Sequence, residues 1–174
     1  GDAGIYGMAG LVLELLAAGK TDGVEVEIVP GITAAVMAAS VLGAPLMNDF
    51  CIISLSDLLT PAAVIRKRLA AAAAGDFVIC LYNPRSHTRT KPLDDALAIL
   101  RSLLSPDTVV GIVRNAGRNG QSQWIGTLET VEPEQVDMFC VMIVGNSATR
   151  VLDGRMVTAR GYEKTGGEKG YGRP

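Results

Sequence analysis

The chain has 174 residues and a formal net charge of −2, with 48% hydrophobic and 20% charged residues. Such a high apolar fraction excludes an intrinsically disordered chain, which is poor in apolar residues. The acidic balance argues against a general nucleic-acid-binding protein, and the length suggests one domain or two small lobes.

The first predicted elements are a helix, a strand and a second helix. A helical apolar pattern covers residues 7–19 and ends at a glycine. Residues 24–29 alternate apolar and acidic side chains, which is typical of a strand. Thr33 stands at the N-cap position of an Ala-rich helix that ends at residues 43–45.

Helices and strands alternate more regularly after this point. Thr60 and Pro61 form a helix start signal, with Thr as the N-cap and Pro at the first helical position. The predicted strands cover residues 50–55, 77–82, 109–113, 123–128 and 139–144, and the predicted helices cover residues 61–75 and 93–104. This alternation indicates an α/β fold. A change in composition suggests the remnant of an N-terminal α/β lobe at 1–46, a C-terminal α/β lobe at 47–160 and a mobile tail at 161–174.

Neither a membrane span nor a secretory leader is expected. The longest apolar candidate, residues 33–47, is interrupted by Ser40, Gly43 and Pro45. A membrane span needs about 20 consecutive apolar residues. No basic segment leads into an apolar run, as a signal peptide would require.

The three cysteines predict buried free thiols in a reduced compartment. Cys51, Cys80 and Cys140 stand far apart, each within an apolar run, and none belongs to a CxxC motif. A cytoplasmic location fits this pattern. With a single histidine and no Cys/His cluster, no protein-bound metal ion is expected.

Two glycine-containing turns stand where α/β proteins bind ligands. Residues 1–7 include glycines that let the backbone approach a ligand closely, and Asp2 could accept hydrogen bonds from hydroxyl or ammonium groups. A simple turn that opens a helix is the alternative. In residues 29–35, Thr33 is favoured as a helix N-cap, but it could also give its hydroxyl to a ligand while Ala34 keeps the wall small.

Two basic loops follow later strands. Residues 82–91 and 113–120 hold a large share of the cations of this acidic chain. Arginine side chains suit carboxylates and phosphates, so these loops could bind an anionic ligand or could simply be solvated. His87 could transfer protons, but an ordinary surface histidine is the more common case.

Seven motifs in one order resemble the tetrapyrrole methylase family. In chain order they are GDAGIYGMA, VPGITAA, APLMNDFCIISLSDLLTP, LYNPRS, GIVRNAGR, MIVGNSATR and GRMVTARGY. NDFCIISLSDLLTP and YNPRS make the chain similar to the members that methylate C17 in cobalamin biosynthesis. The resemblance runs from residue 1 to about Tyr162.

This resemblance implies a two-lobed α/β protein that binds S-adenosyl-L-methionine between its lobes and assembles as a homodimer. It implies methylation of C17 of the tetrapyrrole precorrin-3B, with ring contraction to precorrin-4 and S-adenosyl-L-homocysteine as the other product. The cofactor-binding residues that it implies are Gly1, Asp2, Ile5, Thr33, Ala34, Asn83 and Ala116.

The implied substrate gives the basic loops a role. A tetrapyrrole with acetate and propionate arms carries many carboxylates, which arginines bind well. The expected partners of these arms are Arg85, Arg89, Arg114 and Arg118. His87 is the candidate catalytic residue for the proton movements of ring contraction, and the Arg- and Asn-bearing loops are the alternative.

Some features depart from the family pattern. Ala3 and Ala159 replace prolines that relatives carry. A strand and a GxGPGD-type loop are expected ahead of Gly1 in this family, so we expect the chain to be the C-terminal portion of the enzyme and to be inactive alone. A non-catalytic fragment or interaction module is the alternative function. A dinucleotide oxidoreductase is disfavoured, because residues 1–7 lack GxGxxG spacing.

Overall fold

The computed structural model describes residues 1–20 and 23–161. The predicted mobile tail, apart from Gly161, lies outside the described residues, as does Tyr162 at the end of the resemblance. In chain order the elements are α1 Ala9–Ala17, α2 Ala34–Leu42, β1 Gly43–Ala44, β2 Phe50–Ser54, α3 Ala62–Ala74, β3 Val78–Tyr82, α4 Lys91–Leu103, β4 Val109–Arg114, β5 Ser122–Thr127, the 3₁₀ helix η1 Pro133–Gln135, β6 Cys140–Val144, β7 Thr149–Leu152 and β8 Arg155–Thr158.

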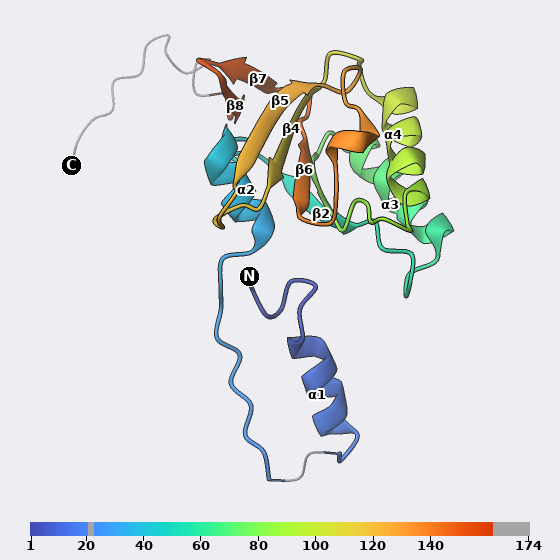
Figure 1. Ribbon diagram of the computed structural model, residues 1–174, viewed down its shortest axis with the longest axis vertical. Coiled ribbons are helices and arrows are strands. Elements are labelled where there is room, and N and C mark those ends of the chain that lie inside the picture. Colours follow the sequence, from blue (N-terminus) through green and yellow to red (C-terminus); the bar gives the residue numbers. More distant parts are fainter. Residues whose placement is uncertain (21–22, 162–174) are drawn as a thin grey trace, which may run out of the picture.

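The larger sheet has five strands in the order β2-β3-β6-β4-β5 (Figure 1). Strand β2 is parallel to β3, whereas β6 is antiparallel to both β3 and β4. Since β3 and β4 both run opposite to β6, the carboxyl ends of β2, β3 and β4 meet at one edge. This mixed sheet with helices confirms the predicted α/β fold, and it brings the two basic loops to the same edge.

Helices cover both faces of this sheet (Figure 1). The residues of β3 alternate between two apolar clusters: Val78, Cys80 and Tyr82 pack with α2, whereas Ile79 and Leu81 pack with α3 and α4. All five are buried, as a continuous apolar run predicts for an interior strand. The sheet is therefore the middle layer of three.

Helix α2 also leads into a second, three-stranded sheet. Its order is β1-β8-β7, and β1 pairs with β8 in parallel. The sequence analysis missed the β7–β8 hairpin, although Asp153 and Gly154 form an Asp-Gly turn signal between its strands. Strand β1, which directly follows α2, thus pairs with a strand from the last part of the described chain. The lobe boundary after residue 46 stays a prediction.

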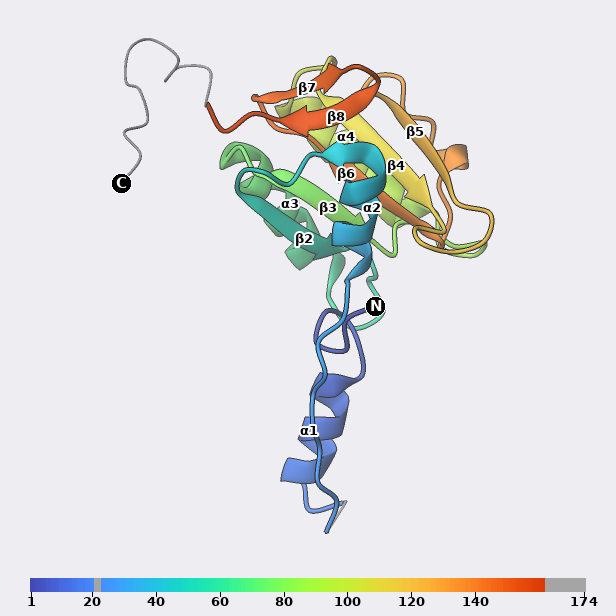
Figure 2. The ribbon, with the colours of Figure 1, turned by 90° about the vertical axis from the view of Figure 1, so that its left-hand side faces the viewer.

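The predicted strand at residues 24–29 is wrong. The chain is extended there but pairs with no strand among the described residues. Figure 2 shows residues 23–32 running beside α1, away from the sheet. The alternation of apolar and acidic residues favours an extended chain locally, but a strand also needs a hydrogen-bonding neighbour. Val24, Val26 and Ile28 remain exposed.

The remaining boundaries differ from the predicted ones by a residue or two. The start of α3 is one example, because Pro61 occupies the N-cap position and the helix begins at Ala62. The prediction of Thr60 as the N-cap is therefore wrong by one residue. Helix α4 begins at Lys91, two residues ahead of its predicted start.

Candidate functional site

An open cleft of about 350 Å³ lies at the sheet edge where β2, β3 and β4 end. Five separate segments line it. Its lining residues are Gly1, Ile32, Ala34, Met37, Tyr82, Asn83, Asn115, Ala116, Gly117, Arg118, Met138, Phe139, Cys140 and Val141. The cleft therefore unites the N-terminal loop, the turn before α2 and both basic loops.

Two asparagines turn the chain sharply at the mouth of this cleft. Asn83 directly follows β3 with φ 51°, and Asn115 directly follows β4 with φ 52°. Asparagine is among the few residues other than glycine that adopt this left-handed region readily. Such backbone conformations cluster at functional sites. The predicted cofactor residue Asn83 lines the cleft, and the sequence analysis missed Asn115, although it too directly follows a strand.

Asn83 is held in place from two sides. Its Nδ2 donates to Ser54 Oγ at 3.0 Å, and its carbonyl accepts from an Arg89 Nη2 at 3.0 Å. Arg89 Nη1 donates to the carbonyl of Leu55, also at 3.0 Å. Arg89 was predicted to bind substrate, but two of its guanidinium nitrogens hold main-chain carbonyls together. This structural task was not foreseen from the sequence.

The Asp2 carboxylate joins two loops. Its Oδ2 accepts from the amide of Gly31 at 2.9 Å, and its Oδ1 accepts from the amide of Gly4 at 2.8 Å. These amides, Gly31 first and then Gly4, lower the pKa of Asp2. A Cβ on Gly31 would lie 2.5 Å from the carbonyl oxygen of Gly1, so only glycine allows this close approach.

Tyr6 attaches the same N-terminal loop to the sheet. Its hydroxyl donates to the carbonyl of Ile52 and accepts from the amide of Ser54, both at 3.2 Å, along the free edge of β2. Its φ of 50° is unusual for a bulky residue. The predicted cofactor residue Ile5 is 40% exposed and is not part of the cleft lining.

Thr33 occupies the N-cap position of α2, but its side chain does not cap the helix. Its Oγ1 instead lies 2.6 Å from the hydroxyl of Tyr82. The Tyr82 oxygen accepts the amide hydrogen bond of Ala35 at 2.5 Å, so it performs the capping task. The predicted N-cap position of Thr33 is confirmed, but the expected capping bond from its side chain is absent, because a phenol from β3 accepts the Ala35 amide instead.

Arg114 is already paired. Its Nε donates to Asp137 Oδ2 at 2.9 Å, and its guanidinium lies 5.7 Å from the ring centroid of Phe139. Partial burial raises the pKa of Asp137, but hydrogen bonds from Arg114, the Phe139 amide and Cys140 outweigh it and lower the pKa overall. Arg114 thus holds the segment that carries Phe139 against the cleft.

A second hollow adjoins the cleft through Met138 and Phe139, which line both. Its volume is about 530 Å³, and its lining includes Arg85 and the exposed His87. Arg85 Nη1 is buried and makes no hydrogen bond, although Glu134 Oε1 lies 3.5 Å away. Buried polar atoms normally have a partner, so this nitrogen is a candidate for binding a ligand.

The structure brings together only some of the predicted site residues. Four of the seven predicted cofactor residues line the cleft, namely Gly1, Ala34, Asn83 and Ala116, and Arg118 lines it with them. Asp2 and Thr33 are hydrogen-bonded to neighbouring segments. Tyr82 and Phe139 also line the cleft but were not among the predicted site residues, because only spatial proximity reveals them.

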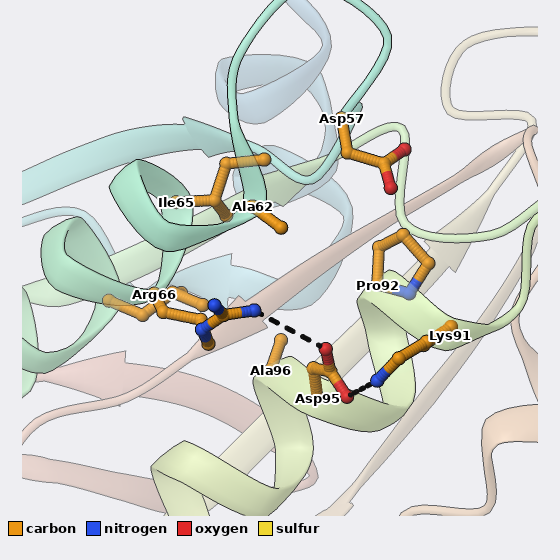
Figure 3. A pocket seen from close by; sticks show the side chains of 9 residues that line it. Asp57, Ala62, Ile65, Arg66, Lys91, Pro92, Asp95 and Ala96 are labelled. Carbon is orange, nitrogen blue, oxygen red and sulfur yellow. Dashed lines mark hydrogen bonds and ion pairs between the residues drawn. The ribbon is translucent and has the colours of Figure 1, made fainter.

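A different hollow lies between α3 and α4, on the face of the sheet opposite α2 (Figure 3). Its volume is about 110 Å³. The Asp95 carboxylate pairs there with Lys91 at 2.6 Å and with Arg66 at 3.8 Å. The charged groups of Asp95, Lys91 and Arg66 thus pair with one another, and none of the predicted site residues lies in this hollow. The cleft at the sheet edge is the better candidate.

Metal-ion and membrane-spanning features are absent from the part of the chain that the structure describes. Residues 1–20 and 23–161 contain no group of three or more His, Cys, Asp or Glu side chains that could hold a metal ion. Over the same residues, no helix combines the length and the apolar character needed to cross a membrane.

These features define an α/β protein with an open cleft at the carboxyl ends of its strands, where proteins of this class commonly bind small molecules. The family model for Tetrapyrrole (Corrin/Porphyrin) Methylases matches residues 1–132. The chain belongs to this family.

Individual relatives extend the comparison. A "Probable cobalt-factor III C(17)-methyltransferase" of Salmonella typhimurium is 57% identical over 162 residues, which cover 93% of this chain and 67% of the relative. The "Cobalt-factor III methyltransferase" of Priestia megaterium is 47% identical, over 94% of this chain and 31% of that relative. The "Precorrin-3B C(17)-methyltransferase" of Sinorhizobium sp is 41% identical, over 88% of this chain and 61% of that relative.

Solved structures agree with the family. The methyltransferase CobJ superposes with a TM-score of 0.86 at 41% sequence identity, covering 91% of this chain and 67% of that one. The cobalt precorrin-4 methyltransferase CbiF, with a TM-score of 0.64 and 24% identity, supports the fold alone. The chain spans about two thirds of the Salmonella relative and of CobJ, and less than that of the other two relatives.

Proposed function

We propose that the cleft forms part of an S-adenosylmethionine site, and that the whole protein methylates C17 of a tetrapyrrole in cobalamin biosynthesis. The observation that carries this proposal is the convergence of Gly1, Ala34, Asn83 and Ala116 on one cleft. These four residues come from segments far apart in the sequence. Family membership and the names of the relatives support the same activity.

The residues of the cleft fit such a cofactor. Ile32, Met37 and Phe139 supply apolar surface, and Asn83 and Asn115 supply amide groups at the strand ends. Small-molecule sites typically combine apolar walls with a few polar groups, in volumes of about 300–1,000 Å³. When bound, the cofactor supplies an electrophilic methyl group. The task of the chain is to orient the two reactants and to exclude water between them.

The adjoining hollow is the proposed site of the substrate. Arg85 Nη1 is buried and forms an ion pair with Glu134 but no hydrogen bond among the described residues, so it could bind a carboxylate arm of a tetrapyrrole, and Arg118 lines the adjoining cleft. Arg114 and Arg89 act through protein partners, so we assign them to positioning. His87 is exposed in the same hollow and is the candidate for moving a proton.

The substrate is a cobalt-containing or a metal-free macrocycle. Relatives named for cobalt-factor III reach 57% identity, whereas the Sinorhizobium relative named for precorrin-3B reaches 41%. These identities favour the cobalt form as substrate. Turnover of each macrocycle by the same preparation, followed by absorbance spectroscopy, distinguishes them.

Assembly and location belong to the same proposal. A cytoplasmic homodimer rests on the family resemblance, and the exposed apolar side chains of α1 are compatible with a further interface. Leu11, Leu13 and Leu15 are all at least 36% exposed. Analytical ultracentrifugation tests the dimer.

Calorimetric titration of S-adenosylhomocysteine tests the cofactor. It is titrated into this chain and into a version extended to the length of the Salmonella relative. Binding to both supports the proposal and places most of the site within these residues. Binding to the extended version alone supports the family activity and makes the additional sequence part of the site. Binding to neither would favour the alternative, a scaffold without the reaction.

A further inference from the structure

The phenol of Tyr82 occupies an unusual place at the start of α2. Tyr82 is the last residue of β3, yet its oxygen accepts the amide hydrogen bond of Ala35 at 2.5 Å. Ala35 is fully buried, so its amide needs a partner. The helix's own Thr33 does not supply one, because its side chain makes no capping bond. The N-terminus of α2 is therefore capped by a different element.

The same hydroxyl also fixes Thr33. Its oxygen receives the Ala35 amide, which leaves the phenol proton available for Thr33 Oγ1 at 2.6 Å. Both bonds act on the turn that presents Ala34 to the cleft. A shift of this turn would change the shape of the cleft wall directly.

The ring of Tyr82 also contacts the N-terminal loop, through Tyr6. The centroids of the Tyr82 and Tyr6 rings lie 5.7 Å apart and the ring planes are tilted by 53°, which is within the range that aromatic pairs prefer. Asn83, the next residue, leaves the strand with a positive φ. One side chain thus connects the N-terminal loop, the turn before α2 and the end of β3.

We propose that Tyr82 is a positioning residue whose hydroxyl holds the Thr33–Ala34 turn in its ligand-binding position. The inference rests on the proposed cofactor site. The Tyr82 hydroxyl is already engaged by Thr33 and Ala35. Tyr82 therefore contributes to cofactor affinity by holding the turn, without a polar contact of its own to the cofactor.

The test is the affinity of Tyr82→Phe for S-adenosylhomocysteine, measured by calorimetry in whichever length of the protein binds it. The ring is retained, and only the hydroxyl is lost. We expect the dissociation constant to rise about tenfold, since two hydrogen bonds that hold the turn disappear. Unchanged affinity would overturn the inference.

A matched control separates positioning from general destabilisation. Thr158 is buried in β8, outside the cleft lining, and its hydroxyl pairs with Thr149 Oγ1 at 2.8 Å. Thr158→Val should lower the melting temperature yet leave the dissociation constant unchanged. An equal loss of affinity in Thr158→Val would mean that Tyr82 acts only through stability, and it would overturn the inference.

Thr33→Val gives a second route, which also holds if Tyr82→Phe does not fold. It removes the hydroxyl pair and keeps the bond between Tyr82 and Ala35, so we expect a rise of a few-fold in the dissociation constant. In the double variant the two effects should be less than additive. Unchanged affinity in Thr33→Val, or full additivity, would count against the proposal. If the unaltered protein binds no S-adenosylhomocysteine at either length, the proposed function fails and this inference with it.

Discussion

The carboxylate of Asp2 accepts a hydrogen bond from the amide of Gly31 at 2.9 Å, across 29 residues of sequence. This contact ties the N-terminal loop to the turn before α2. Both loops belong to motifs of the family, and each contributes to the wall of the cleft, through Gly1 and Ala34. The acidic residue thus builds the site through main-chain contacts.

Asp2→Asn should weaken cofactor binding. An amide side chain offers one acceptor oxygen where the carboxylate offers two, and it loses the charge that strengthens both bonds. We expect the dissociation constant for S-adenosylhomocysteine to rise about fivefold to tenfold, with little change in melting temperature. Asp57→Asn is the control, because Asp57 is exposed and lines the hollow between α3 and α4. Equal affinities of the Asp2 variant and the unaltered chain would refute this role.

Gly31→Ala should separate the same two loops by steric contact. The added methyl would lie 2.5 Å from the Gly1 carbonyl oxygen, which is backbone and cannot simply rotate away. Binding of S-adenosylhomocysteine should fall by more than tenfold in calorimetry. Gly10→Ala is the matched control, since a Cβ added at this position in α1 would meet no atom within 4 Å. That variant should bind normally and gain about 0.5–1 kcal/mol in helix stability. Normal binding by Gly31→Ala would contradict the prediction.

Arg89→Ala should destabilise the fold. The variant leaves the carbonyls of Leu55 and Asn83 without their charged donor, which costs about 1.5–3 kcal/mol per bond of this type. Urea unfolding measures this loss. Lys91→Ala, two residues away, removes only an exposed ion pair with Asp95, worth about 0–1 kcal/mol. If both variants lose the same small amount, Arg89 is free for substrate, as the sequence analysis expected.

The buried thiols should make stability fall at alkaline pH. Burial raises the pKa of Cys80 to about 12 and that of Cys140 to about 11, from 9.0. The folded state therefore keeps both protons where the unfolded state releases them. Their contribution to the free energy of unfolding is complete below about pH 9 and is lost as the pH rises through 11 to 12.

Urea titrations between about pH 8 and 10.5 measure the early part of this slope, and Cys80→Ala should reduce it. A disulfide reagent at about pH 8 should label the half-buried Cys51 first, and all three cysteines only after denaturation. Rapid labelling of all three in the folded chain would rule out this account.

Much of the fold follows from local patterns. The apolar runs of β3 and β6, both fully buried, and the amphipathic pattern of α4 are readable from the sequence. The order of the strands is not, because pairing depends on contacts between distant segments. Residues 24–29 are the clearest example. Their alternating pattern predicted a strand, but no neighbouring strand among the described residues pairs with them.

The site was predictable to a different extent. Motifs named Gly1, Ala34, Asn83 and Ala116, which do line one cleft. They could not reveal that Tyr82 caps α2, because that contact spans 47 residues and leaves no periodic trace. Nor could they distinguish Arg89, which binds main-chain carbonyls, from Arg85, which has a buried nitrogen that makes no hydrogen bond among the described residues.

The N-terminal arm, residues 1–20 and 23–32, contributes one wall of the cleft and is held by few contacts with the sheet. Helix α1 has no buried residue, and the arm joins the body mainly through the hydroxyl of Tyr6 and the chain that leads to α2. Such a segment can open while the sheet stays intact. The amides of Gly4 and Gly31 should then exchange hydrogen far faster than those of β3. If the cleft binds its ligand as proposed, bound ligand should slow hydrogen exchange at Gly4 and Gly31.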